Sequence, residues 1–223
     1  VRNHTEAGTF EAVIPDLDRI RDLGTDIIWL MPIHPIGEAK RKGGEGSPYA
    51  IRDYRAVNPE FGTLEEFKHL VEEIHARGMK CIIDVVYNHT SPDSTLVKEH
   101  PEFFYHKPDG SFGNRFGDWA DVIDLDYTVR GLWDYQIESL KMWAGIVDGF
   151  RCDVIDQIDK DWAGNRNCFG PRLHEFIHAL YGIFVIITVE PVDKSHSTVT
   201  FGGKESVFGK AIPLGFIDGK CRK

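Results

Sequence analysis

The chain has 223 residues, 42% hydrophobic and 27% charged, a composition typical of a globular protein with one large domain or two small ones. Its 26 basic and 35 acidic residues give a net charge of -9, which disfavours nucleic acid and anionic membranes as partners and suits a neutral substrate. No apolar run approaches the roughly 18 residues of a membrane span, and no signal peptide opens the chain. Its four cysteines show no CxxC pair, so the sequence leaves the cellular compartment open.

Helices and strands are predicted to alternate along the chain. Pro15 suits the first turn of a helix, the apolar run 26–32 is typical of a strand covered on both faces, and Thr63 with Glu66 forms a capping box. The predicted elements, in order, are a helix at 15–23, a strand at 26–32, a loop at 34–62, a helix at 63–78, a strand at 81–87, an inserted subdomain at 90–128, a helix at 132–143, a strand at 149–154, a helix from 171 and a strand at 184–190.

This alternation predicts an α/β fold with a parallel sheet, for which two architectures compete. A doubly wound dinucleotide-binding fold would carry a GxGxxG motif directly after its first strand, and the sequence has none there. In a (β/α)8 TIM barrel, the C-terminal ends of several strands carry the reactive groups. Because His89, Asp153 and Glu190 each follow a predicted strand, the barrel is the preferred interpretation.

The predicted barrel is incomplete. Residues 1–89 form its first part, 90–128 an inserted subdomain after the third strand, 129–193 its continuation, and 194–223 an unassigned tail. A closed barrel usually takes about 250 residues even without an insertion. We therefore expect an open half-barrel with unpaired sheet edges and exposed apolar faces, which a complementing protein or chain segment could cover.

Residues 149–155 carry the most informative pair of charges. Arg151 lies two residues before Asp153 in a predicted strand, so both side chains point to the same face. The arginine would keep the carboxylate ionised, as a covalent glycosyl-transfer nucleophile requires. The alternative is a buried ion pair that only holds a helix to the sheet.

Three motifs together resemble the α-amylase superfamily, glycoside hydrolase family 13, over residues 1–193. They are Asp84-Val85-Val86-Tyr87-Asn88-His89, Gly149-Phe150-Arg151-Cys152-Asp153 and Thr188-Val189-Glu190, supported by 47–54, 61–63 and 122–127. The resemblance implies that Asp153 is the nucleophile, Arg151 its charge partner and Glu190 the general acid and base. It also implies that His89 and Tyr49 bind the sugar. Such a site suits a retaining glycosidase, whose two carboxyls lie about 5 to 5.5 Å apart.

The resemblance also implies a calcium ion at Asn88 and Asp124, positions that bind calcium in many relatives. Two ligands are far fewer than the six to eight that calcium usually takes.

Other interpretations stay open for the remaining site residues. Tyr49 could pack the loop and His89 could cap a turn. Relatives have a glycine before the residue matching Glu190, and a one-residue slip would turn this carboxylate to the other face of its strand.

Two classes of function remain. One is an enzyme that hydrolyses or transfers α-glucosidic bonds of starch-like glucans or malto- and isomalto-oligosaccharides. The other is a non-catalytic barrel fragment that binds sugar or a partner, which the lack of the family's third carboxylate favours. Signals for exo- or endo-action conflict. Ala50 stands where exo-acting relatives usually have an aspartate, which favours a longer cleft, whereas Asp156 and Gln157 replace a pair common in endo-amylases. Metal-dependent hydrolysis through Asp84 and His89 is disfavoured, since no second histidine lies at ligand spacing.

Overall fold

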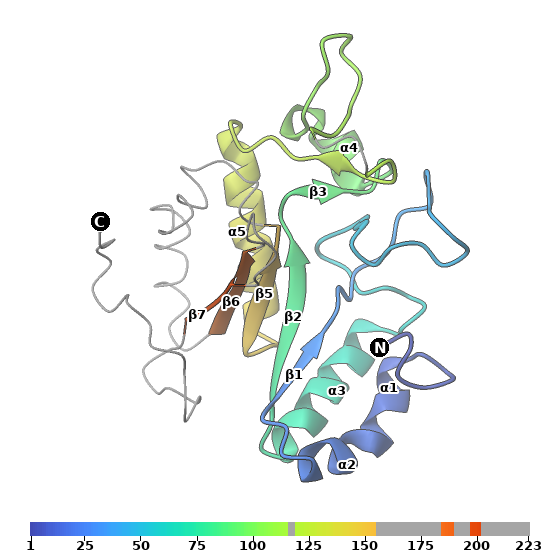
Figure 1. Cartoon of the computed structure of the whole chain (residues 1–223), viewed down its shortest axis with the longest axis vertical. Coiled ribbons are helices and arrows are strands. Elements are labelled where there is room, and N and C mark those ends of the chain that lie inside the picture. The colour runs from blue at the N-terminus through green and yellow to red at the C-terminus, as the bar shows by residue number, and fades with distance from the viewer. Residues whose placement is uncertain (116–118, 155–183, 190–196, 202–223) are drawn as a thin grey trace.

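The main sheet contains five strands in the order β1-β2-β5-β6-β7. The computed structural model describes residues 1–115, 119–154, 184–189 and 197–201, the last two as backbone (Figure 1). The strands are β1 (Ile27–Leu30), β2 (Lys80–Val86), β5 (Gly149–Asp153), β6 (Phe184–Val189) and β7 (Ser197–Phe201). The first four are parallel and follow the order of the chain, as in a barrel, whereas a doubly wound sheet reverses its strand order. Among the described residues the sheet stays open.

The last strand of the sheet corrects the prediction of a purely parallel sheet. β7 pairs with β6 in the antiparallel direction, with Val185 opposite Phe201. Only residues 190–196 separate the two strands, whereas a parallel crossover takes a dozen residues or more. The predicted helix from residue 171 lies outside the described residues.

The first helix begins earlier than predicted. α1 (Phe10–Val13) follows Thr9, whose hydroxyl accepts a hydrogen bond of 3.4 Å from the amide of Ala12. A 3-10 turn (Ile14–Asp16) and α2 (Leu17–Asp22) continue it. Pro15 lies in the 3-10 turn rather than at the helix start, because it has no N–H to donate to an α-helical ladder.

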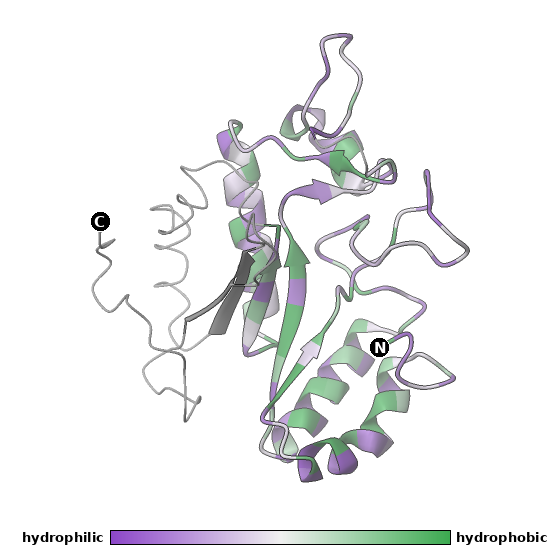
Figure 2. Ribbon diagram, in the orientation of Figure 1, coloured by the Kyte–Doolittle hydropathy of each residue, from purple (hydrophilic) through white to green (hydrophobic). Residues whose placement is uncertain are grey.

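The predictions for the next helix and strand are confirmed. α3 (Leu64–Ala76) starts with the complete capping box of Thr63 and Glu66. It buries Phe67, Leu70, Val71 and Ile74 against the sheet. Figure 2 shows this helix with hydrophobic and hydrophilic stretches in turn, whereas β2 is mainly hydrophobic because it is covered on both faces. This packing fixes the strand that carries Asp84.

Strand β1 differs from its prediction because only one of its faces is covered. Leu30 is buried, whereas Trp29 is 51% and the following Met31 49% exposed. β1 lies at the edge of the described sheet, next to β2 alone. Leu30 belongs to the core that α1 and α3 cover, whereas Trp29 points to the opposite face of the sheet, near the guanidinium of Arg151.

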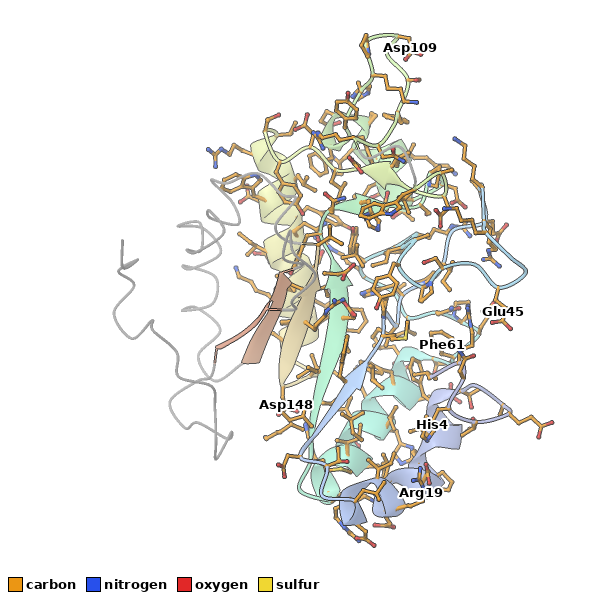
Figure 3. The ribbon with its side chains drawn as sticks, viewed as in Figure 1. His4, Arg19, Glu45, Phe61, Asp109 and Asp148 are labelled. Carbon is orange, nitrogen blue, oxygen red and sulfur yellow. The ribbon has the colours of Figure 1, made fainter. Side chains whose placement is uncertain are left out.

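The inserted segment lies beyond the C-terminal end of β2 (Figure 1), with Asp109 at its tip (Figure 3). Its elements are β3 (His89–Thr90), α4 (Thr95–Glu99), a 3-10 turn (Pro101–Phe103) and β4 (Ile123–Asp124). β3 and β4 form a separate antiparallel pair, in which His89 lies opposite Asp124. The segment is thus held directly at the end of the strand where catalytic groups are expected.

Helix α5 (Arg130–Ala144) connects the inserted segment to β5. Trp143 anchors it, because its indole nitrogen donates a hydrogen bond of 2.7 Å to the carbonyl of Tyr54 and its ring packs against Phe67. The buried face also includes Gln136 and Ser139, which hydrophobic spacing alone does not indicate. No helix in the described part of the chain is long and apolar enough to cross a membrane.

Candidate active site

Arg151 stands between two carboxylates on neighbouring strands. In the β2–β5 register, Asp84 lies opposite Arg151 and Val86 opposite Asp153. Nη1 of Arg151 is 3.0 Å and 3.2 Å from the two carboxylate oxygens of Asp84 and 2.5 Å from Oδ1 of Asp153. Arg151 and Asp153 therefore share a face, as their spacing predicts, and one guanidinium nitrogen serves both acids.

Asp84 belongs to this group, although the sequence indicated it only as a disfavoured metal ligand. Its side chain is fully buried, whereas those of Arg151 and Asp153 are 13% and 16% exposed. One signal marks it in the sequence: it is the only charged residue between Cys81 and Tyr87, in a run that is otherwise apolar. A charge in such a strand needs a partner. That partner became identifiable only with the strand register.

Burial dominates the electrostatics of this cluster. It raises the pKa of Asp84 to about 7, although Arg151 and the Tyr49 hydroxyl both act in the opposite direction. The two carboxylates raise the pKa of Arg151 above its usual value, despite the opposing effect of its own burial. The guanidinium therefore stays charged while Asp84 can exchange a proton near neutral pH.

Tyr49 reaches the cluster from the loop after β1. Its hydroxyl donates a hydrogen bond of 3.2 Å to Oδ2 of Asp84. Burial, followed by the charge of Asp84, raises the pKa of Tyr49, so the phenol keeps its proton. On the other side, the guanidinium of Arg151 lies 5.2 Å from the ring centre of Trp29. Trp29 is a second aromatic neighbour of the cluster that sequence reasoning missed.

The residue after Asp153 has an unusual backbone. Val154 has a φ of 50°, in the left-handed region that β-branched residues rarely adopt. Such conformations cost about 1 to 3 kcal/mol and concentrate at functional sites. The strain lies directly at the C-terminal end of β5, where the chain leaves the sheet.

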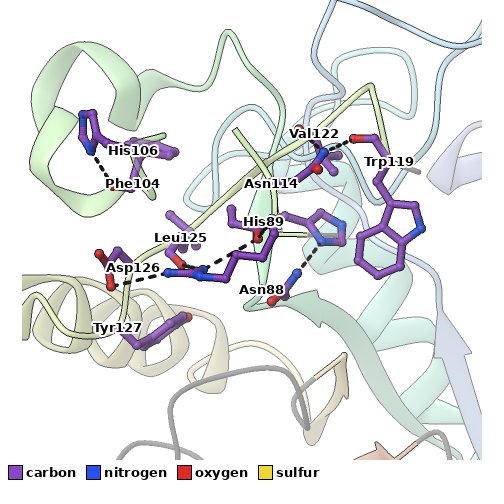
Figure 4. Close-up of polar contacts among 12 residues, drawn as sticks. Asn88, His89, Phe104, His106, Asn114, Trp119, Val122, Leu125, Asp126 and Tyr127 are labelled. Carbon is purple, nitrogen blue, oxygen red and sulfur yellow. Dashed lines mark hydrogen bonds and ion pairs between the residues drawn. The ribbon is translucent and has the colours of Figure 1, made fainter. Parts of the chain in front are cut away.

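His89 forms a second group at the end of β2 (Figure 4). Its Nδ1 is 3.2 Å from Nδ2 of Asn88, and its ring meets the indole of Trp119 edge-on at 5.2 Å. With the amide donating, the imidazole keeps its proton on Nε2. Burial lowers the pKa of His89 to about 4, so it is neutral at physiological pH. Trp119, from the inserted segment, is another neighbour that the sequence did not indicate.

Asn88 and Asp124 lie close together, but the described residues do not by themselves fit a calcium ion. Oδ2 of Asp124 accepts a hydrogen bond of 2.7 Å from the amide of Arg115, whose guanidinium is 3.6 Å from the same oxygen. Oδ1 of Asp124 is buried without a hydrogen-bond partner in the described part of the chain. No group of three acidic, histidine or cysteine ligands occurs among the described residues. Calcium at this position stays a prediction.

Glu190 lies outside the described residues. The backbone of β6 ends at Val189, in parallel register with β5, so that Ile186 lies opposite Arg151 and Ile187 opposite Cys152. The strand before Glu190 is thus the predicted neighbour of the strand that carries Asp153. The role of Glu190 stays a prediction.

Charged groups gathered at the C-terminal ends of parallel strands, with aromatic rings beside them, are placed as in the active sites of barrel-type α/β enzymes. Comparison with known proteins narrows this class. The family model for the alpha amylase catalytic domain matches residues 2–111. Together with the relatives below, this shows that the chain belongs to the α-amylase superfamily of glycosidases.

Individual relatives match different shares of the chain. A crystal structure of an alpha-amylase from Lactobacillus plantarum is 52% identical, with a TM-score of 0.77 over 84% of this chain and 43% of that one. The alpha-1,4-glucan:maltose-1-phosphate maltosyltransferase of Salinibacter ruber is 40% identical over 50% of this chain and 20% of its own length. The trehalose-6-phosphate hydrolase of Bacillus subtilis is 31% identical over 78% and 37%. The chain thus spans less than half the length of each.

Proposed function

We propose that this chain carries the nucleophile-bearing part of a site that cleaves or transfers α-glucosidic bonds in starch-like glucans or in malto- and isomalto-oligosaccharides. The observation that carries the proposal is the contact of one Arg151 nitrogen with both Asp84 and Asp153. A guanidinium at this distance favours the ionised form of Asp153, and an ionised carboxylate is the nucleophile of a retaining glycosidase.

The proposed reaction is a double displacement. A carboxylate oxygen of Asp153 attacks the anomeric carbon, the glycosidic C–O bond breaks, and Glu190 gives its proton to the leaving oxygen. Water, or the hydroxyl of an acceptor sugar, then attacks the same carbon. Glu190 takes up the proton of this nucleophile as the bond between the carbon and Asp153 breaks. Two inversions leave the configuration of the anomeric carbon unchanged.

The remaining residues have binding roles in this proposal. Tyr49 stacks its ring on the sugar while its hydroxyl is held by Asp84, which orients the ring. His89 donates from Nε2 to a sugar hydroxyl, since its Nδ1 is turned to Asn88. Asp84 positions Arg151, and through it Asp153, without contacting the substrate. Tyr49 and His89 thus bind the sugar, whereas Asp84 only orients Arg151.

The test measures reducing-sugar release from soluble starch and from isomaltose-type oligosaccharides, by the purified chain and by Asp153→Asn. Loss of activity in the variant supports the double displacement, and the preferred substrate identifies the linkage. A 5-fluoroglycosyl fluoride, which forms the covalent intermediate but releases it slowly, provides a second readout. We expect intact-mass analysis to detect the label on wild type and not on Asp153→Asn.

The exposure of Trp29 (51%) and Met31 (49%) favours a second candidate function, a non-catalytic barrel fragment that packs against a complementing protein or chain segment. Large apolar side chains on an open sheet face commonly mark an interaction surface. A folded chain that neither turns over nor takes up the covalent label would support this candidate. Glucan affinity then separates sugar binding from packing alone.

A further inference from the structure

Arg115 gathers several oxygens of the inserted segment around one guanidinium. Its Nη1 donates a hydrogen bond of 3.2 Å to the carbonyl of Leu125 and is 3.6 Å from Oδ2 of Asp124. Nη2 is 3.7 Å from Oδ1 of Asp126, and the group lies 4.5 Å from the ring centre of Tyr105. Oxygens of three successive residues thus share one cation.

These three residues attach the inserted segment to the end of β2. Asp124 lies opposite His89 in the β3–β4 pair, and the amide of Leu125 donates a hydrogen bond of 2.9 Å to the carbonyl of Asn88. Figure 4 shows Leu125 and Asp126, which follow β4, near Asn88 and His89. Whatever neutralises Asp124 therefore also holds His89 in place.

The side chain of Asp124 is fully buried, and burial raises the pKa of its carboxyl, so that its ionised form needs a cation nearby. An ionised carboxylate without a partner is very costly in such a position. Arg115 supplies both a positive charge and a backbone hydrogen bond of 2.7 Å. A calcium ion on the same carboxylate would be repelled by this guanidinium, and it would need six to eight oxygens.

We propose that the guanidinium of Arg115 is the resident cation of the inserted segment, in the place for which calcium was predicted from Asn88 and Asp124. The chain fixes Asp124, Leu125 and Asp126 with one of its own side chains. The position of His89 then depends on Arg115 and not on the supply of a metal ion. This inference concerns the cation alone and holds whether or not the proposed reaction takes place.

The first experiment follows thermal unfolding of the wild-type chain by circular dichroism, after EDTA treatment and in millimolar CaCl2. We expect the same Tm in both. Arg115→Ala should lower Tm by roughly 5 °C or more, because it leaves a buried carboxylate unpaired. Arg21→Ala, which removes an exposed ion-paired arginine, is the matched control and should change Tm little.

A double variant separates loss of charge compensation from simple loss of packing. Asp124→Asn removes the buried charge, so adding it to Arg115→Ala should recover part of the lost Tm. If Arg115 only packs against Tyr105, the two losses will add. A wild-type Tm that falls in EDTA, or stoichiometric calcium retained after gel filtration and detected by elemental analysis, would overturn the proposal. Neither readout uses catalytic activity, so failure here is distinct from failure of the proposed function.

Discussion

The hydroxyl of Tyr49 donates a 3.2 Å hydrogen bond to Oδ2 of Asp84, and this bond ties the loop after β1 to the centre of the sheet. The same carboxylate accepts from Arg151, which also contacts Asp153. A chain of three contacts thus connects a residue proposed to stack on sugar with the proposed nucleophile. Changes at Tyr49 or Asp84 should therefore affect the chemistry without touching Asp153 itself.

Tyr49→Phe should separate orientation from stacking. The ring stays, but Asp84 loses a donor, which leaves Arg151 and the loop less firmly held. We expect kcat on the preferred glucan to fall about tenfold, equivalent to about 1.4 kcal/mol, with little change in KM. Tyr49→Ala also removes the ring and should raise KM. Equal kinetics for wild type and Tyr49→Phe would show that the hydrogen bond has no part in catalysis.

Asp84 should make the stability of the chain depend on pH. Burial gives its carboxyl a folded pKa of about 7, well above the value of an exposed aspartate, so the folded state binds the proton more tightly. Its contribution to the free energy of unfolding is complete below the unfolded pKa and is lost as pH rises towards 7. The slope is at most about 1.4 kcal/mol per pH unit.

The comparison with Asp84→Asn isolates this contribution, because the other titrating groups contribute equally to the stability of wild type and variant. Urea unfolding from pH 5 to pH 8 should show the wild-type advantage over the variant shrinking as pH rises. An advantage that grows with pH would mean that Arg151 outweighs burial and lowers the pKa of Asp84.

His34 should have the opposite dependence. Its ring is fully buried against Trp143, Nδ1 is 3.0 Å from the carbonyl of Ala56, and Nε2 has no partner among the described residues. Burial lowers its pKa to about 4, so its contribution to stability is complete above its unfolded pKa of about 6.5 and is lost as pH falls through 4. His34→Asn keeps a donor but cannot titrate.

We expect His34→Asn to lower the free energy of unfolding at pH 7 by about 1 to 3 kcal/mol, because the variant loses ring packing. The difference from wild type should shrink between pH 6.5 and pH 4 in urea unfolding. A constant difference over this range would show that His34 protonates equally well in the folded chain.

The capping box of α3 should contribute to stability and not to activity. The hydroxyl of Thr63 accepts from the amide of Glu66 at 3.2 Å, and the amide of Thr63 donates to the Glu66 carboxylate at 2.6 Å. Thr63→Ala should cost about 1 kcal/mol in urea unfolding and leave glucan kinetics unchanged, whereas Thr63→Ser should retain most of the stability. Loss of activity in a fully folded Thr63→Ala variant would contradict this separation.

The parts of the fold that the sequence predicts are those set by local pattern. The apolar stripe of Phe67, Leu70 and Ile74 and the preceding capping box identify α3 without any tertiary information. The features of the fold that differ from the prediction depend on contacts between residues far apart in the sequence. The exposure of Trp29 depends on which face of the sheet the helices cover, and the direction of β7 depends on its pairing with β6.

The candidate site divides in the same way. The spacing of Arg151 and Asp153 indicates their shared face, since two residues along a strand always return to the same side. The place of Asp84 opposite Arg151 depends on the register between two strands whose residues are 67 positions apart in sequence. Arg115 was missed for another reason: its partners lie only 9 and 10 residues away, but this part of the sequence has no helical or strand periodicity that would predict the contact.

The half-exposed indole of Trp29 allows binding to the open sheet face to be followed by intrinsic tryptophan fluorescence. Trp133 and Trp143 are 3% and 1% exposed and should emit at short wavelengths, whereas Trp29 faces water and the guanidinium of Arg151. The chain also has Trp119 and Trp162, so the difference between wild type and Trp29→Phe gives the emission of Trp29. A sugar or partner that settles over the open sheet face should therefore shift the long-wavelength emission to the blue and protect it from acrylamide quenching. Occupancy of this face can thus be followed by fluorescence without a label, even under conditions in which no bond is cleaved.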